Sequence, residues 1–131
     1  MVVIATSAAV TTGARDRQRL RAYFARIPRT KGRIVAWKPT GLWEQEAVQA
    51  MAPRLSVLGG IDAIADPAPS VDVAYATLVA EGLRRSFSYA QLQDVYDKLQ
   101  GAGAARAYVT IESPQSFREA RLLQALSEGR E

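Results

Sequence analysis

The stretch from Val71 to Gln100, VDVAYATLVAEGLRRSFSYAQLQDVYDKLQ, determines the expected fold class. Residues Val71–Val79 are mostly apolar, with β-branched and aromatic side chains among them, which is typical of a buried strand. Ser88 is suited to cap a helix from Tyr89 to Gln100, because its hydroxyl can accept a hydrogen bond from a free amide of the first turn. A strand followed in this way by a helix is the repeating unit of an α/β protein with mostly parallel strands.

The same alternation continues in both directions along the chain. Strands are expected at Val2–Thr6, Arg33–Trp37, through Ile61 and Ile64 to Asp66, Val71–Val79 and Ala107–Glu112. Helices are expected at Ala14–Ile27, Trp43–Ala52 with Pro53 after its end, Tyr89–Gln100, and from Ser113-Pro114 to about Ser127. Gly59-Gly60 is expected to form a turn before the third strand. The expected fold is therefore α/β, a parallel five-stranded sheet with helical crossovers, in a single domain spanning residues 1–131.

The composition excludes several classes of chemistry. The chain has no cysteine and no histidine, which removes disulfides, thiol and imidazole catalysis, and the usual ligands of zinc, copper and haem. We therefore expect neither a metal nor another cofactor. The chain contains no apolar run of the roughly 18 residues that a membrane span needs, and Met1 leads into Val2–Ile4 without a basic leader segment. A soluble cytoplasmic protein is expected.

Several short motifs follow one another in a characteristic order. They are AWKPTGLW at Ala36–Trp43, Asp66-Pro67, YATLVA at Tyr75–Ala80, FSY at Phe87–Tyr89 and YVTIES at Tyr108–Ser113. In order and spacing they resemble W-E-P-R-G-x-W, D-P, Y-F-R-L-H-G, Y-S-Y and Y-V-x-F-N-N of the domain of unknown function 72 family, whose members adopt a TIM-barrel-like fold. The resemblance covers almost the whole chain but only the C-terminal half of the family's fold. Because a closed barrel takes roughly 250 residues, it implies a sheet like a truncated, or half, TIM barrel.

The departures from the family pattern fall on the polar residues that would line its pocket. They are Lys38 for glutamate, Thr40 for arginine, Thr77 and Val79 for arginine and histidine, Ala80 for glycine, and Glu112 with Ser113 for two asparagines. Asp66 alone keeps the pocket pattern. The resemblance therefore implies a degenerate relative, and we expect a non-catalytic protein that acts through self-association or through binding of a ligand or partner. Whether it is an enzyme stays open.

A candidate ligand site lies where the expected strands end. Lys38, Asp66 and Glu112 are expected at the C-terminal ends of neighbouring strands, with Thr77 nearby, and side chains converge there in α/β sheets. The sequence favours an ion-pair cluster that fills a disused pocket. The alternative is a weak metal-dependent or phosphate-directed hydrolase that uses Asp66 and Glu112.

One face of the expected sheet has no helix to cover it. Right-handed crossovers place all helices of a barrel on the outer face. The side chains expected on the other face are largely apolar: Ile4, Ile34, Ala36, Ile64, Tyr75, Val79 and Tyr108. Because a contiguous apolar patch cannot stay in water without consequence, we expect a homodimer. The alternative is an open sheet with helices on both sides.

The stretch from Arg15 to Arg33 is strongly basic, with eight basic residues and the single acid Asp16. On a helix, Arg15, Arg19 and Arg26 share one outer face, while the opposing stripe is formed by Leu20, Phe24 and Ile27. The sequence favours an ordinary solvated helix face. Binding of nucleic acid through these three arginines is a third alternative for the function.

Overall fold

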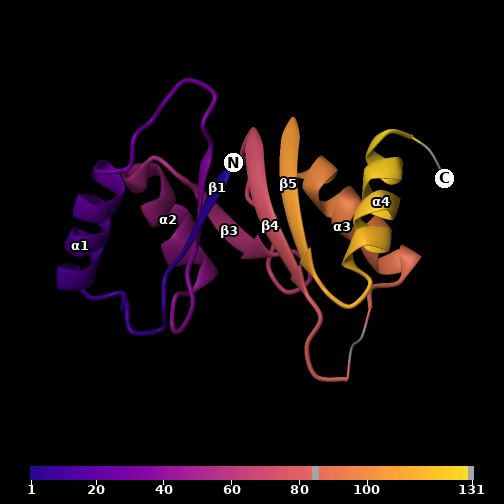
Figure 1. The fold of residues 1–131 in the computed structure, drawn as a ribbon, viewed down its shortest axis with the longest axis horizontal. Coiled ribbons are helices and arrows are strands. Elements are labelled where there is room, and N and C mark those ends of the chain that lie inside the picture. The colour runs from indigo at the N-terminus through magenta and orange to yellow at the C-terminus, as the bar shows by residue number, and fades with distance from the viewer. Residues whose placement is uncertain (84–85, 130–131) are drawn as a thin grey trace. The chain divides into compact units, whose positions relative to one another are not determined.

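The computed structural model of the protein describes residues 1–83 and 86–129. Its elements follow in the order β1 (Val2–Ala5), α1 (Ala14–Ala25), β2 (Val35–Lys38), α2 (Gln45–Leu55), β3 (Leu58–Asp62), β4 (Val73–Val79), α3 (Tyr89–Gly101), β5 (Arg106–Glu112) and α4 (Ser116–Ser127) (Figure 1). The strands lie in the sheet in the same order as in the sequence, as they do in a barrel. The pairs β1–β2, β2–β3 and β4–β5 are parallel. The expected α/β fold with a parallel five-stranded sheet and helical crossovers is confirmed.

The chain divides into two compact units, Met1–Gly60 and Ile61–Glu131. The boundary falls inside β3. Each unit has a hydrophobic core of its own, formed where its helices pack on its strands. The expectation of a single domain over the whole chain stays a prediction.

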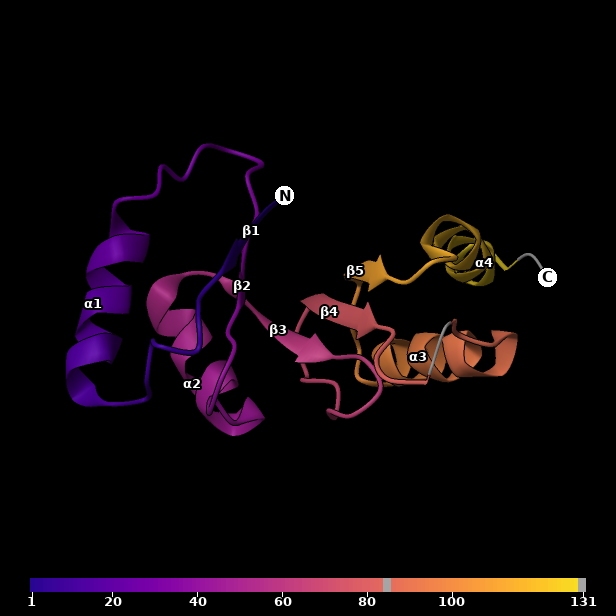
Figure 2. The ribbon, with the colours of Figure 1, turned by 60° about the horizontal axis from the view of Figure 1, so that its bottom comes forward.

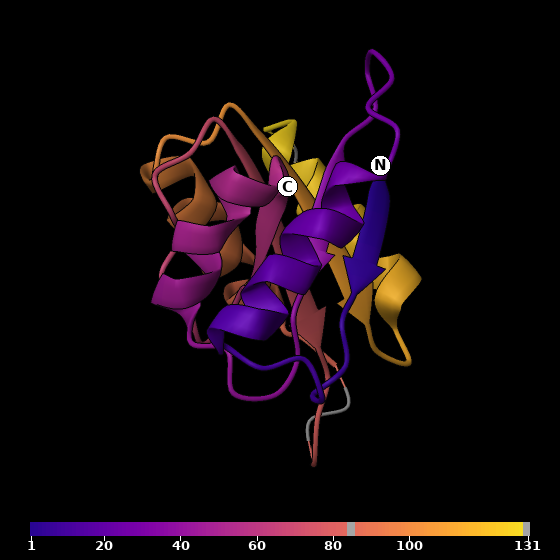
Figure 3. The same ribbon diagram turned by 90° about the vertical axis from the view of Figure 1, so that its left-hand side faces the viewer.

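The core of the first unit lies between β1, β2 and the helices α1 and α2, which cover the same side of these strands (Figures 2 and 3). Leu20 and Phe24 are buried and Ile27 packs beside them, so the apolar stripe expected on α1 is confirmed.

Trp37 of β2 fills the centre of the core of the first unit. Its ring meets those of Phe24 and Trp43 edge to face, with centroids 6.4 and 4.9 Å away. Its indole N–H donates to Thr6 Oγ1 at 3.1 Å, so burial leaves no unpaired donor.

The core of the second unit lies between β4, β5 and the helices α3 and α4 (Figure 1). The start of α3 follows the sequence prediction. Ser88 Oγ accepts from the Gln91 N–H at 3.2 Å, and Gln91 Oε1 accepts from the Ser88 N–H at 2.9 Å. This reciprocal capping box satisfies two backbone amides and fixes where the helix begins.

Two predicted boundaries around α2 are wrong. Pro53 lies inside α2 and not after it, because the helix continues to the buried Leu55, whose contacts with the core favour one more turn. Gly59 and Gly60 belong to β3 and not to a turn. The reason is visible at Gly59, where a Cβ would lie only 3.1 Å from Val48 Cγ1 of α2. The glycine lets the strand approach the helix closely.

The third strand ends earlier than predicted. Asp62 closes β3, and its Oδ1 accepts from the N–H groups of Ile64 and Ala65 at 2.8 and 3.1 Å. This Asx-type turn leaves Ile64 outside the sheet, contrary to the prediction. A similar correction applies to Pro114, which precedes α4 in a turn that Ser113 caps by accepting from the Gln115 N–H at 3.1 Å.

The helix-free face of the sheet differs in part from the prediction. In β4, Ala74, Ala76 and Leu78 pack towards the helices. Tyr75, Thr77 and Val79 therefore lie on the other face, with Tyr108 opposite Tyr75.

Ile4 was expected on the helix-free face but packs into the helix-side core of the first unit. Ala36 and Tyr75 are only 0% and 2% exposed, so the chain itself already shields these side chains. The bare apolar patch that first suggested a dimer is therefore absent at these two positions.

Candidate functional site

The four residues predicted for a ligand site fall in both units. Lys38 is the last residue of β2 in the first unit and is partly exposed. Asp66, Thr77 and Glu112 belong to the second unit. There Thr77 and Glu112 lie on the helix-free face, on neighbouring strands, while Asp66 lies in the turn after β3.

The side chain of Asp66 closes a turn. Its Oδ2 accepts from the Asp62 N–H at 2.8 Å, and its backbone amide donates to the Asp62 carbonyl at 3.0 Å. The carboxylate that matched the family pattern therefore holds the end of β3 in place. The hydroxyl of Thr77 has a similar role, because it donates to the Ile61 carbonyl at 3.3 Å.

Lys98 of α3 holds the same turn from the other side. Its Nζ donates to the carbonyl oxygens of Ala63, Asp66 and Ile64 at 2.8, 2.9 and 3.2 Å. These charge-assisted bonds satisfy three carbonyl groups that have no strand partner. No sequence signal indicates this role, since a lysine near the end of an amphipathic helix usually lies in water.

A buried carboxylate and a partly buried hydroxyl lie where β5 leads into α4. Glu119 is 2% exposed, and its Oε1 accepts from Ser113 Oγ at 2.6 Å. Its Oε2 is buried and has no hydrogen-bond partner within residues 1–83 and 86–129. The N-terminal turn of a helix favours a negative charge, which lowers the cost of burying this carboxylate. Sequence reasoning missed Glu119, because an acid in the first turn of a helix is usually exposed.

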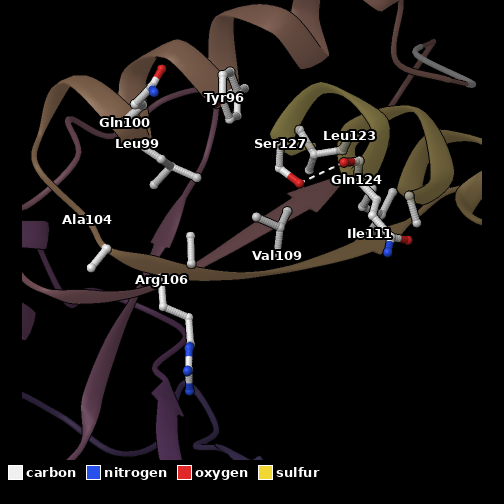
Figure 4. Close-up of a pocket in the computed structure, with 13 residues that line it drawn as sticks. Tyr96, Leu99, Gln100, Ala104, Arg106, Val109, Ile111, Leu123, Gln124 and Ser127 are labelled. Carbon is white, nitrogen blue, oxygen red and sulfur yellow. Dashed lines mark hydrogen bonds between the residues drawn. The ribbon is translucent and has the colours of Figure 1, made fainter. Parts of the chain in front are cut away.

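A pocket of about 460 Å³ opens in the second unit between α3, β5 and α4 (Figure 4). Its walls are mainly apolar and include Leu99, Val109, Ile111 and Leu123. Figure 4 shows the guanidinium of Arg106 pointing away from these side chains. The volume is within the usual range for small-molecule sites, and the lining suits a largely apolar molecule. The sequence did not predict the pocket, because its lining comes from α3, β5 and α4 and the segment between α3 and β5.

The three arginines considered for nucleic acid are exposed, as expected. Arg15 and Arg19 lie on α1 and Arg26 at its C-cap, and the buried residues of the helix are Leu20 and Phe24 on the opposing side. The amphipathic character predicted for this helix is therefore confirmed.

Two structural tests concern metal ions and membranes. In the described part of the chain, no three acidic side chains lie close enough together to hold a metal ion. None of the helices formed by residues 1–83 and 86–129 has the length and hydrophobicity to cross a bilayer. Comparison of the chain with protein-family models, with curated proteins and with solved structures finds no significant match.

Proposed function

We propose that the protein acts without catalysis, through self-association as a homodimer, and that β1 forms the contact. The observation that carries this proposal is the open edge of β1. Val2 donates its N–H group to the carbonyl of Ile34, just before β2, at 2.8 Å, and Thr6 donates to the Lys38 carbonyl at the end of β2 at 3.1 Å. Because alternate residues of a strand face opposite edges, the backbone groups of Val3 and Ala5 face outwards. No strand among the described residues pairs with this outer edge.

The edge of β1 lacks the features that usually prevent pairing. Its residues, Val2–Ala5, include no charge and no proline. Val3 is also 37% exposed, which is high for a valine in a strand. Exposed apolar edge strands of this kind favour pairing with another chain.

The charge of the two units favours β5 of a second copy as the partner of β1. Met1–Gly60 holds ten of the 17 basic but three of the 13 acidic residues, so its formal charge is +7 and that of Ile61–Glu131 is −3. β1 belongs to the positive unit, and β5, the other edge strand, to the negative one. Pairing β1 with β5 brings opposite charges together, whereas pairing β1 with β1 does not.

Light scattering on the purified protein tests the proposal. At tens of micromolar we expect twice the 14.3 kDa of the chain. Val3→Lys places an ammonium on the open edge and leaves the hydrogen bonds to β2 intact, so this variant should be monomeric. The matched control is Val71→Lys, since Val71 is 38% exposed but lies outside the strands. A well-folded monomeric wild type would overturn the proposal, as would equal dissociation of both variants.

The proposal includes two further expectations from the sequence. The chain is a degenerate relative of the domain of unknown function 72 family, and the protein is cytoplasmic. The hydrolase alternative has less support, because the Oδ2 of Asp66, one of its two carboxylates, already accepts the Asp62 N–H.

A second candidate function is the binding of a small, neutral, largely apolar molecule in the pocket between α3, β5 and α4. The apolar lining of this pocket is the observation that favours it. NMR shifts induced by indole, used as the probe, should cluster around Val109 and Leu123. Ala107→Phe fills part of the pocket and should abolish them, whereas Ala90→Phe, outside the pocket, should not. Shifts scattered over the surface would exclude this function.

A further inference from the structure

An exposed aromatic ring lies among the arginines of α1. Tyr23 is 51% exposed, and with Arg15, Arg19 and Arg26 it follows the helical spacing i, i+4, i+8 and i+11. Residues at this spacing lie along one side of a helix. We call these four residues the α1 basic face. It is about 16 Å long, because a helix rises about 1.5 Å per residue.

Two other arginines of this stretch, Arg17 and Arg29, have structural roles, which separates them from the α1 basic face. Arg17 donates to the Thr12 carbonyl, and its guanidinium lies 5.3 Å from the ring centre of Trp43. Arg29 donates to the Leu55 carbonyl at 3.0 Å and so connects the ends of the two helices. By contrast, the side chains of Arg15 and Arg26 make no hydrogen bond or ion pair in the part of the chain that the structure describes.

The one acid of the stretch does not neutralise the α1 basic face. The Asp16 carboxylate accepts from the N–H and the hydroxyl of Thr11, both at 2.8 Å, and lies 3.7 Å from the Arg19 guanidinium. The Thr11 hydrogen bonds, assisted by Arg19, lower the pKa of Asp16 below its usual value. Three guanidinium groups against one carboxylate leave the α1 basic face with a net positive charge.

We propose that the α1 basic face binds single-stranded nucleic acid. The three arginines contact phosphates, and Tyr23 stacks on an unpaired base. A row of cations with an exposed aromatic ring is the arrangement by which proteins hold single strands without sequence preference. A membrane surface fits less well, since the α1 basic face carries no exposed aliphatic side chain to enter the bilayer. This inference is independent of the homodimer.

Fluorescence anisotropy with labelled oligo(dT) and oligo(U) of about 12 nucleotides tests the proposal. At low salt we expect binding whose logarithmic salt dependence has a slope of about −2, as three phosphate contacts on a single strand would give. The variant R15Q/R19Q/R26Q should lose this binding. Its control, R54Q/R118Q/R121Q, removes the same charge elsewhere and should bind nearly as well as wild type.

The role of Tyr23 separates nucleic acid from other polyanions. Tyr23→Ala should weaken binding about 5-fold or more, because a base loses its stacking partner, whereas Tyr23→Phe should keep the affinity. Heparin and vesicles containing phosphatidylserine serve as competing partners. The proposal is overturned by no binding at low salt, by equal binding of duplex and single strands, by an unchanged affinity of Tyr23→Ala, or by vesicle binding without oligonucleotide binding.

Discussion

At the scale of single residues, Lys98 and Asp66 show how polar side chains can be used to build a turn. The Asp66 carboxylate and the Lys98 ammonium bind backbone groups of the segment that follows β3. Asp66 could be identified as a candidate from the sequence, because it matches a motif, but its structural role could not be predicted. The role depends on the end of β3 at Asp62, and the position of this end depends on a side-chain hydrogen bond. Lys98 could not be found, since its three carbonyl partners are more than 30 residues away.

Removal of the Lys98 ammonium should destabilise the second unit. Lys98→Met keeps the length and helix propensity of the side chain but leaves partly buried carbonyl groups unpaired. We expect the free energy of unfolding in urea to fall by about 1–2 kcal/mol. Lys31→Met is the control, because Lys31 is exposed and lies outside the helices. A loss no greater than that of the control would show that water replaces Lys98 without cost.

At the scale of elements, the boundary that depends on a local sequence signal was predicted correctly, whereas the boundaries that depend on long-range packing were not. The start of α3 was correct, because Ser88 and Gln91 supply both halves of the capping box within one turn. The ends of α2 and β3 were wrong, because Leu55 and Gly59 act through contacts that bring two elements together. Gly59 looked like a turn residue, but its lack of a side chain serves the approach of β3 to α2.

The contact between β3 and α2 should tolerate no larger residue than glycine at position 59. A Cβ there would lie 3.1 Å from Val48 Cγ1 and 3.2 Å from Ala52 Cβ, so in Gly59→Ala these side chains of α2 must shift by a few tenths of an ångström. Overpacking of this kind costs about 1–3 kcal/mol in the free energy of unfolding. Thermal and urea unfolding measure the loss. Gly101→Ala is the control, because a Cβ there meets no atom within 4 Å, and it should be neutral or slightly stabilising.

At the scale of the whole molecule, the sequence predicted the fold class, but the structure offers a different basis for the proposed dimer. Alternating strand and helix patterns were enough for a parallel α/β sheet, since they depend on local periodicity. The dimer was inferred from an exposed sheet face, yet Ala36 and Tyr75 on that face are shielded within one chain. What favours self-association instead is the backbone of β1, whose open edge no side-chain pattern reveals, together with the opposite charges of the two units.

The central claim, that β1 pairs with a second copy through its outer edge, is tested most directly by amide hydrogen exchange at single-residue resolution. The N–H groups of Val3 and Ala5 face this edge, so they should exchange slowly at high protein concentration and faster on dilution. Val2 and Thr6 donate to β2 within one chain, so their exchange should not follow the concentration in this way. Fast exchange of Val3 and Ala5 at every concentration, beside protected Val2 and Thr6, would contradict the account.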